Sequence, residues 1–221
     1  MNMRDLVVGR TSSLGGRARA RRWQYLYSTF PQLGSYRVLD LGGTPGSWLQ
    51  APVQPRSLTV LNLYDGELQI GYETSSLPSW ITVVAGDACD PPQHVREQQF
   101  DLVFSNSLIE HVGGSFRRKM LASFICGTSS RYWIQTPYRY FPIEPHWIFP
   151  AFQFLPLATR SWLSRTWPLM HSRAEDWTSS VVTALDVELL SITEMNYLFP
   201  EATIYRERMF GLVKSIIAIR S

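Results

Sequence analysis

Five short apolar runs, spaced along residues 36–137, constrain the fold of this chain more than any other feature. Each run is rich in β-branched and aromatic residues and too continuous to alternate between apolar and polar, as expected of strands covered on both faces. The runs are YRVLDL (36–41), LTVLNL (58–63), ITVVAG (81–86), FDLVFS (100–105) and YWIQTP (132–137). Because helical or irregular segments separate them, the pattern predicts a mainly parallel sheet in a doubly wound α/β fold.

Two helices can be predicted with their ends. The segment SFRRKMLASFICG lies between the fourth and fifth runs, and its apolar residues recur at helical spacing. Those residues are Phe116, Met120, Leu121, Phe124 and Ile125, and Gly127 supplies a C-terminal stop. Further on, SITE is a capping box with Ser191 at the N-cap and Glu194 at N3, so a short helix should run through Phe199.

The C-terminal part of the chain differs in character. Residues 138–190 are rich in proline and tryptophan, contain no clean strand, and are interpreted as an aromatic, cap-like insert. Beyond the insert, 202–210 and 212–220 predict two strands joined by a tight turn at Gly211, an antiparallel hairpin that closes one edge of the sheet. No repeat or low-complexity linker appears, so we expect one domain, with a basic helical segment over about residues 1–34.

Composition limits the classes of function. With 45% hydrophobic and 18% charged residues the chain is globular, and its net charge of +3 is mild. The arginines of RARARR (17–22) are interpreted as a solvated helix face. Cys89 and Cys126 form no short-spaced pair, which argues against a disulfide framework or zinc site and favours a reducing compartment. No run of about 18 uncharged apolar residues occurs, so we expect a cytoplasmic protein, with peripheral membrane contact left open.

A glycine-rich turn, DLGGTPGSW (40–48), follows the first run. Glycines there let a ligand approach the backbone near a helix N-terminus. The dinucleotide motif G-x-G-x-x-G would need glycine at Thr44 and Ser47, and no Gly-Lys-Ser/Thr follows for a phosphate loop. Asp40 and the glycines instead resemble the D/E-x-G-x-G-x-G signature of class I S-adenosylmethionine (SAM) dependent methyltransferases, with Thr44 replacing the middle glycine.

The resemblance continues across residues 36–137 and into the final hairpin. FDLVFSNSLIEHV is similar to the "EH" segment of the small-molecule, ubiquinone/menaquinone-type (type 11) subgroup. It implies a Rossmann-like, seven-stranded sheet of order 3-2-1-4-5-7-6, and SAM as the cofactor. By this resemblance Asn62 stands where the family has a ribose-binding acid, Asp87 and Ala88 would lie beside the adenine, and Ser105 would lie beneath the cofactor. The implied cofactor-binding residues are Asp40, Gly42, Gly43, Thr44, Gly46, Asn62, Leu63, Asp87, Ala88, Ser105 and Asn106.

Two histidines are candidates for a catalytic base. The cofactor carries the reactivity of methyl transfer, so a base is needed only for an acceptor that must lose a proton, such as a sugar hydroxyl. His146 in IEPHW is the preferred base, and His111, just after the fourth run, is the second, with Glu110 and Glu144 nearby. Each also has a structural interpretation: His146 stacked under Trp147, and His111 satisfying backbone groups at a helix start.

Missing motifs narrow the acceptor. The fourth run ends in SNS (105–107) and not in the N/D-P-P-Y/F motif that grips planar amino groups. Lys119 and Lys214 are the only lysines, too few for the lysine-rich tetrad of ribose 2′-O-methyltransferases. Asn106 alone does not make the acidic metal site of the catechol type, so we expect no metal, and no nucleic-acid partner either. What remains is a small-molecule, glycan or lipid-linked acceptor, with transfer to oxygen ahead of nitrogen or carbon.

Two questions stay open from the sequence. The first concerns the aromatic residues of the insert. Three roles are open to them: lining an apolar acceptor pocket, contacting a membrane surface, or packing in the core. We expect a core position for most of them. They are Trp147, Phe149, Phe152, Phe154, Trp162 and Trp167. The rival to an enzyme is a non-catalytic SAM-binding or scaffold protein that keeps the fold. Thr44 and Asn62 favour that rival, because both depart from the family pattern.

Overall fold

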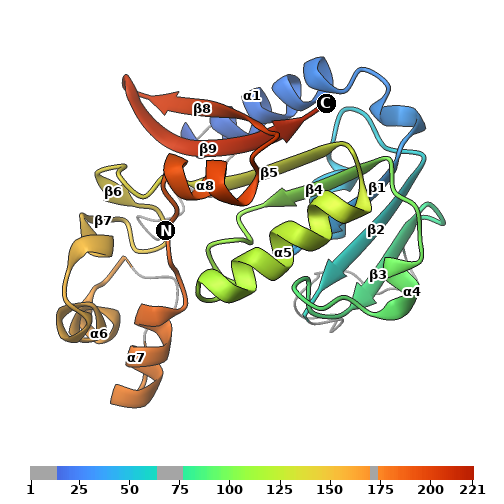
Figure 1. The fold of residues 1–221 in the computed structure, drawn as a ribbon. Coiled ribbons are helices and arrows are strands. Elements are labelled where there is room, and N and C mark those ends of the chain that lie inside the picture. The colour runs from blue at the N-terminus through green and yellow to red at the C-terminus, as the bar shows by residue number, and fades with distance from the viewer. Residues whose placement is uncertain (1–13, 64–76, 170–173) are drawn as a thin grey trace.

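The computed structural model describes residues 14–63, 77–169 and 174–221, and a seven-stranded sheet forms its centre (Figure 1). The strands lie in the order β3-β2-β1-β4-β5-β9-β8. They are β1 (Arg37–Leu41), β2 (Ser57–Asn62), β3 (Ile81–Ala85), β4 (Leu102–Asn106), β5 (Tyr132–Pro137), β8 (Thr203–Met209) and β9 (Leu212–Arg220). β1 to β5 are parallel, and β9 runs antiparallel to both β5 and β8. The α/β fold, the five strands and their order are confirmed.

Helices cover both faces of the sheet, which explains why the central strands are apolar along their whole length. One face packs against α4 (Gln93–Arg96), α5 (Ser115–Thr128) and α8 (Ile192–Leu198). The other packs against α1 (Leu14–Thr29), the short 3₁₀ turn at Leu33–Ser35, and α2 (Pro45–Leu49). Every residue of β5 is buried, as expected for a strand covered on both sides.

The predicted helix between β4 and β5 is confirmed, but two of its details are wrong. α5 continues through Thr128, so Gly127 lies inside the last turn and does not stop the helix. A glycine late in a helix costs only about 0.5–1 kcal/mol relative to alanine, which the packing of the rest of the helix tolerates. Phe116, counted in the apolar repeat, is 73% exposed, because it sits in the first turn outside the buried face.

The two C-terminal predictions are confirmed. α8 begins with the capping box: the Ser191 hydroxyl accepts from the Glu194 N–H, and the Glu194 carboxylate accepts from the Ser191 N–H. β8 and β9 form the hairpin at the sheet edge. Its turn places Phe210 at φ 51° and Gly211 at φ 81°, the left-handed pair that a tight two-residue hairpin requires.

The insert leaves and rejoins the sheet at one place, since Tyr138 and Leu190 pair as an isolated bridge. Between them lie two-residue strands β6 (Ile143–Glu144) and β7 (Phe149–Pro150), a 3₁₀ turn at Phe152–Phe154, and helices α6 (Leu157–Thr166) and α7 (Trp177–Leu185). Figure 1 shows this cap beyond the ends of β4 and β5, apart from the main helical layers.

The aromatic side chains of the cap divide three ways. Trp147 and Phe152 are buried and stacked, with ring centroids 4.0 Å apart. Phe154 and Trp162 are exposed, by 52% and 59%, so they lie outside the core that was expected for most of these rings. Phe149 and Trp167 are half-buried. The small core of the cap consists of Trp147, Phe152 and Leu163, with Phe149 and Leu155 packed against it, and does not enclose all six rings.

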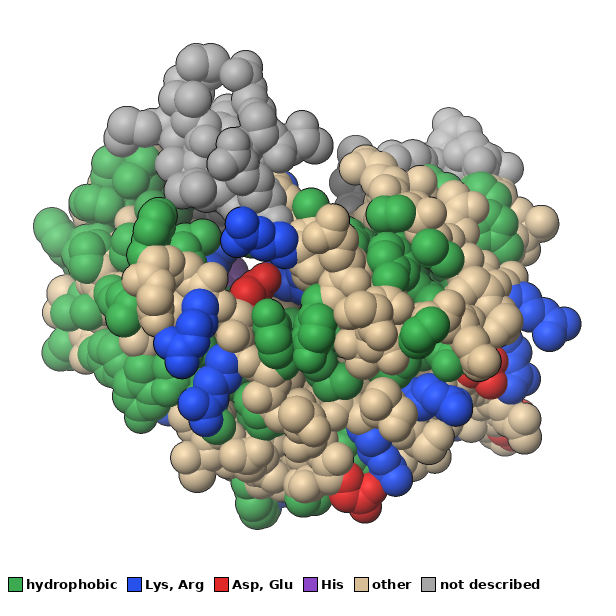
Figure 2. Space-filling model, turned by 90° about the horizontal axis from the view of Figure 1, so that it is seen from above, with side chains coloured by type: hydrophobic (Ala, Val, Ile, Leu, Met, Phe, Trp, Pro, Cys, Tyr) green, Lys and Arg blue, Asp and Glu red, His purple; other side chains and the backbone are tan. Residues whose placement is uncertain are grey.

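No helix of the described segments is long and apolar enough to cross a membrane. Figure 2 shows the face seen from above, where Lys and Arg side chains lie in separate small groups among hydrophobic and other side chains. On that face the basic residues therefore form no continuous stripe of the kind that follows a phosphate backbone.

Candidate functional site

The glycine turn after β1 is shaped by close contacts that leave no room for a side chain. Gly42 has φ +74°, and a Cβ there would lie 2.7 Å from Leu108 Cδ1. A Cβ on Gly43 would lie 1.8 Å from Asp40 Oδ2. Glycine is therefore required at 42 for backbone conformation and at 43 for space. The chain then enters α2, with Pro45 at its start.

Asp40 is a buried carboxyl beside that turn, only 1% exposed. Its Oδ2 accepts a hydrogen bond from Trp48 Nε1 at 2.8 Å, and its Oδ1 has no partner among the residues that the structure describes. Desolvation raises the pKa of Asp40 to about 7, and the hydrogen bond from Trp48 opposes this only in part. An unpaired buried oxygen of this kind fits a cationic or hydrogen-donating ligand group.

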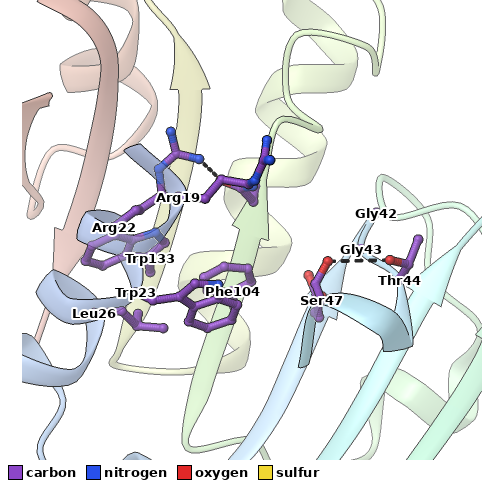
Figure 3. Close-up of a pocket in the computed structure, with 12 residues that line it drawn as sticks. Arg19, Arg22, Trp23, Leu26, Gly42, Gly43, Thr44, Ser47, Phe104 and Trp133 are labelled. Atoms are coloured by element: carbon purple, nitrogen blue, oxygen red, sulfur yellow. Dashed lines mark hydrogen bonds between the residues drawn. The ribbon is translucent and has the colours of Figure 1, made fainter. Parts of the chain in front are cut away.

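A cavity of about 230 Å³ lies between the glycine turn and α1 (Figure 3). Its lining comes from α1, the turn, and the strands β4 and β5: Arg19, Arg22, Trp23, Leu26, Asp40, Gly42, Gly43, Thr44, Ser47, Phe104, Asn106 and Trp133. Trp23 and Phe104 stack with centroids 5.9 Å apart and form an apolar wall. The cavity thus joins backbone, one carboxyl and aromatic surface.

Thr44 does not strain the turn. Its backbone is extended, with φ −132° and ψ 147°, a region open to any residue. Its hydroxyl lies 3.5 Å from that of Ser47, on the cavity side of the turn. Replacement of the middle glycine of the signature is therefore sterically neutral here. Gly46 lies within the first turn of α2 and is not among the lining residues.

Asn62 ties the end of β2 to the glycine turn. Its Nδ2 donates to the Gly43 carbonyl at 3.1 Å, and its Oδ1 accepts from the Leu63 N–H at 2.9 Å. One amide hydrogen and one lone pair remain for a ligand. Leu63 is 58% exposed at the strand end.

Asp87, which follows β3, is held as a charged carboxylate. Its Oδ2 accepts from Arg117 Nη2 at 2.7 Å, and its Oδ1 accepts from the Cys89 N–H at 2.9 Å. Partial burial alone would raise its pKa, but the hydrogen bonds from Arg117 and Cys89 outweigh this and lower the pKa overall. Ala88, beside it, is buried. Arg117 was not singled out in the sequence, where it is one of several arginines.

Ser105 and Asn106 have different surroundings at the end of β4. Ser105 is fully buried, and its hydroxyl donates to the Leu41 carbonyl at 3.1 Å, next to the glycine turn. Asn106 lines the cavity and accepts from Arg22 Nη1 at 2.8 Å. Arg22 also donates to Glu207 at 2.7 Å, and its side chain is only 15% exposed. The interpretation of its arginine run as a solvated face is therefore wrong for Arg22.

The structure brings His111 and His146 together. Their ring centroids are 5.0 Å apart and their planes are nearly perpendicular, at 86°. Glu110 completes the group, and one ligand-type atom from each of the three residues lies within 4.8 Å of the others. Glu110 and His111 follow β4, whereas His146 lies in the turn between β6 and β7. We call Glu110, His111 and His146 the histidine cluster.

Carboxylates orient both rings of the histidine cluster. Glu144 Oε1 lies 2.6 Å from His146 Nδ1, and Glu144 Oε2 accepts from the Trp147 N–H. Desolvation would lower the pKa of His146, but the hydrogen bond and charge of Glu144 outweigh it and raise the pKa overall. Asp186 Oδ2, beyond α7, lies 3.4 Å from His111 Nδ1. With Nδ1 engaged in both rings, Nε2 is the nitrogen available to a ligand.

Glu110 is completely buried, and burial raises its pKa. Thr136, from β5, donates to its Oε2 at 2.9 Å, while Oε1 has no partner within the described part of the chain. Neither Thr136 nor Asp186 was expected from the sequence. No sequence signal could have found them, because their contacts join segments far apart in the chain.

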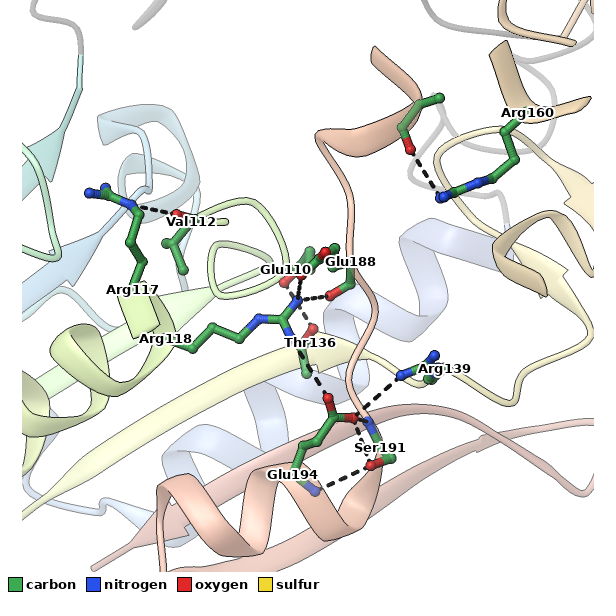
Figure 4. Close-up of polar contacts among 11 residues, drawn as sticks. Glu110, Val112, Arg117, Arg118, Thr136, Arg139, Arg160, Glu188, Ser191 and Glu194 are labelled. Carbon is green, nitrogen blue, oxygen red and sulfur yellow. Dashed lines mark hydrogen bonds and ion pairs between the residues drawn. The ribbon is translucent and has the colours of Figure 1, made fainter. Parts of the chain in front are cut away.

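Arg118 holds the end of the cap against α5 (Figure 4). Its Nη2 donates to the Glu188 carbonyl at 2.6 Å and to the Glu188 carboxylate at 2.9 Å. The Glu188 N–H in turn donates to the Glu110 carbonyl at 2.9 Å. This chain of contacts fixes the cap beside the histidine cluster.

The remaining histidines do not join the site. His94 is exposed on α4. His171 lies outside the described residues.

No protein-family model matches the chain, and no curated protein matches it. Solved structures do match it over nearly its whole length.

The N-methyltransferase NodS from Bradyrhizobium japonicum WM9 is 11% identical, and the match covers 92% of this chain and 96% of that one, with a TM-score of 0.54. The magnesium protoporphyrin IX methyltransferase ChlM from Synechocystis PCC 6803, with bound S-adenosylhomocysteine (SAH), is 12% identical, with coverage of 93% and 82% and a TM-score of 0.53. The N-terminal domain of EvdMO1, in the presence of SAH and D-fucose, is 16% identical, with coverage of 92% and 82% and a TM-score of 0.53. The architecture described above, with its strand order and terminal hairpin, is therefore that of the class I SAM-dependent methyltransferases.

Proposed function

We propose that this protein is a SAM-dependent methyltransferase that acts on a hydroxyl group of a small-molecule, glycan or lipid-linked acceptor. The observation that carries the proposal is the cavity at the glycine turn, where Gly43 packs onto Asp40 and one oxygen of Asp40 is unpaired. Two of the similar structures, ChlM and the EvdMO1 domain, were determined with SAH, and their TM-scores nearly equal that of NodS.

The residues at the turn fit such a cofactor. SAM carries a positively charged amino group and a sulfonium, and either suits a buried carboxyl that lacks a partner. Gly42 and Gly43 leave space that a Cβ would fill. The residues that would hold SAM are Asp40, Gly42, Gly43, Thr44 and Gly46 for the methionine part, Asn62 and Leu63 for the ribose, Asp87 and Ala88 for the adenine, and Ser105 and Asn106 beneath it. When bound, SAM supplies an electrophilic methyl group.

The histidine cluster supplies the chemistry toward the acceptor. Glu144 engages His146 at Nδ1, which leaves Nε2 as the free nitrogen of a ring that lies 5.0 Å from the His111 ring, centroid to centroid. A hydroxyl placed there would have its proton within reach of an imidazole nitrogen. The D-fucose present with EvdMO1 also favours an acceptor with hydroxyl groups. NodS, an N-methyltransferase, supports the alternative that the methyl group is transferred to nitrogen.

A non-catalytic SAM-binding protein is the second candidate, and Asn62 is the residue that favours it. Both polar atoms of its side chain already have backbone partners, and it lacks the charge of the family's ribose-binding acid. Thr44 no longer argues for this candidate, because its backbone is unstrained.

Calorimetric titration with SAH tests the cofactor site that both candidate functions require. Wild type should bind SAH. Gly42→Val should not, because the new Cβ would collide with Leu108. Gly127→Ala, at a helical glycine with free space around it, is the control. A labelled-methyl screen of sugar, phenol and lipid-linked hydroxyl acceptors then tests catalysis. Binding without methyl transfer to any acceptor supports the non-catalytic candidate, and absence of SAH binding contradicts both. Full turnover by His146→Gln on a hydroxyl acceptor would make His146 structural.

A further inference from the structure

We propose that the histidine cluster, Glu110, His111 and His146, binds one divalent transition-metal ion. The ion would hold the acceptor's oxygen, and that last role alone rests on the proposed methyl transfer. From the sequence we expected no metal, because Asn106 alone does not make the acidic site of the catechol type and the two cysteines form no short-spaced pair.

The ligand set is the first argument. Two imidazoles and one carboxylate are donors for zinc, iron and neighbouring metals, and three protein ligands leave open positions for other molecules. One ligand-type atom from each residue lies within 4.8 Å of the others. Three ligands about 2.0–2.2 Å from a tetrahedral zinc ion lie about 3.3–3.6 Å apart, so ligand atoms that lie within 4.8 Å of one another must close by roughly 1 Å when an ion binds. The His111 side chain is 30% exposed, so its ring is the member of the cluster that can supply that movement.

Glu110 is the second and strongest argument. Its side chain is completely buried, yet only Oε2 has a donor, the hydroxyl of Thr136. Oε1 has no hydrogen-bond partner in the segments that the structure describes. A buried carboxylate oxygen is costly unless it pairs with a cation or a donor. Arg118 is committed to Glu188, and the basic groups that act on Glu110 are the two histidines of the cluster. A metal ion held by both imidazoles would give this oxygen a cationic partner.

The surroundings of the rings are the third argument. Metal-binding histidines characteristically donate their second ring nitrogen to a carboxylate or carbonyl, which fixes the tautomer and the ring orientation. His146 meets Glu144 in this way at 2.6 Å, and Asp186 Oδ2 lies 3.4 Å from His111 Nδ1, at ion-pair distance and without a hydrogen bond. Both contacts use Nδ1, so both Nε2 atoms remain as ligands.

The position of the cluster explains what the ion would do. Leu108 packs against Gly42, and Glu110 and His111 follow Leu108 in the same turn after β4. The cluster therefore lies along the same edge of the sheet as the cofactor cavity. A bound divalent ion lowers the pKa of a coordinated hydroxyl, whose proton leaves to water. The metal would thus replace the direct proton acceptance by an imidazole.

Binding of Co²⁺ to metal-stripped protein tests the proposal directly. The protein is treated with a chelator, dialysed, and titrated with Co²⁺ by calorimetry and visible absorption. We expect one ion per chain in wild type, and affinity at least about tenfold weaker in His111→Gln and in His146→Gln. Asp186→Asn, which removes the partner of His111, should weaken binding by about 10–100-fold. His94→Gln is the matched control, an exposed histidine on α4 that should bind as wild type.

Measuring Co²⁺ uptake and SAH binding on the same preparations distinguishes failure of the metal site from failure of the proposed methyltransferase function. SAH is titrated into the same preparations, and it reports both folding and cofactor binding. Absence of stoichiometric Co²⁺ uptake by wild type overturns the proposal, and so does equal uptake by wild type and both histidine variants. Uptake with thiolate absorption that survives in both variants assigns the ion to Cys89 or Cys126 and also overturns it. Co²⁺ binding without SAH binding leaves the metal site standing and contradicts the methyltransferase proposal.

Discussion

The glycine turn and the histidine cluster lie along the same edge of the sheet but are built in opposite ways. The turn comes from one stretch, 40–48, and its decisive contacts, Gly43 against Asp40 and Trp48 to Asp40, lie within it. The cluster draws on the turn after β4, on β5, on the β6–β7 turn and on the chain beyond α7. Contacts from Leu108 and Asn62, at the ends of neighbouring strands, complete the turn. The cluster depends in addition on how the cap is seated.

The two regions nevertheless share one electrostatic feature, a buried carboxyl group with an oxygen left unpaired by the described part of the chain. Each contains a buried carboxyl that accepts one hydrogen bond from a neutral donor, Trp48 for Asp40 and Thr136 for Glu110. In each, burial raises the pKa and the second oxygen lacks a partner in the described residues. Both regions are thus prepared for positive charge from outside the chain. The expected sources differ: a cationic cofactor at the turn and a metal ion at the cluster.

Gly43→Ala should produce the largest effect and separate the two regions. The new methyl group would lie 1.8 Å from Asp40 Oδ2, far closer than two non-bonded atoms can approach. The carboxyl must therefore move and give up its hydrogen bond from Trp48. We expect loss of detectable SAH binding and destabilisation of more than about 2 kcal/mol in urea unfolding. Gly127→Ala, with nothing near its Cβ, should instead stabilise α5 by about 0.5–1 kcal/mol. Wild-type SAH affinity in Gly43→Ala would contradict the assigned role of the turn.

Arg118→Met should act on the cluster and spare the turn. Arg118 is 8% exposed on its side chain and holds both the carbonyl and the carboxylate of Glu188. Its loss leaves these acceptors unpaired and should destabilise the protein by about 1–3 kcal/mol. Co²⁺ affinity should fall while SAH affinity stays within about twofold, since Glu188 bonds to the Glu110 backbone. Arg220→Met, which removes an exposed pair with Glu201, is the control, with an effect below about 1 kcal/mol.

Asp40→Asn should change how stability depends on pH. The pKa of Asp40 is raised to about 7 in the folded protein, above its ordinary value of 3.8, so between these values the folded state binds more protons than the unfolded state. Stability must therefore fall as pH rises through this window, by at most about 1.4 kcal/mol per pH unit from this group. Urea unfolding from pH 5 to pH 8 should show Asp40→Asn gaining stability relative to wild type.

Asp101→Asn provides the comparison for that measurement. Its hydrogen bonds from Arg37 outweigh partial burial and lower the pKa of Asp101, so the group is charged in both states above pH 5. The difference in stability between this variant and wild type should stay flat from pH 5 to pH 8. A flat profile for Asp40→Asn as well would mean that Asp40 is not buried as a neutral acid.

The regions also differ in how far the sequence could predict them. The strands were predictable because burial on both faces demands continuous apolar runs, and each run matches its strand within two residues. The turn was predictable because Asp40 and the glycines are adjacent. For the cluster, the sequence singled out His111 and His146, but Thr136 and Asp186 reach them only through folding of the cap.

Two of the sequence-based predictions that were wrong have different physical causes. Arg22 was interpreted as solvated because it belongs to a run of arginines, yet α1 turns this one toward the cavity and the Glu207 carboxylate. Gly127 was interpreted as a stop because glycine often follows a helix, yet the last turn of α5 accepts it. The position of Arg22 is set by contacts with residues distant in sequence, whereas Gly127 remains helical because a glycine late in a helix costs only about 0.5–1 kcal/mol.

Thr44→Gly should give the smallest effect and test the turn at its one departure from the signature. The backbone of Thr44 is extended and its side chain makes no capping bond to α2, so glycine would relieve no strain. Greater freedom of the unfolded chain should cost about 0.4–1 kcal/mol of stability. SAH affinity should stay within about threefold of wild type, because the hydroxyl has only a 3.5 Å contact with Ser47. A tenfold gain in affinity would instead show that Thr44 narrows the turn, and would restore the argument for a weakened cofactor site.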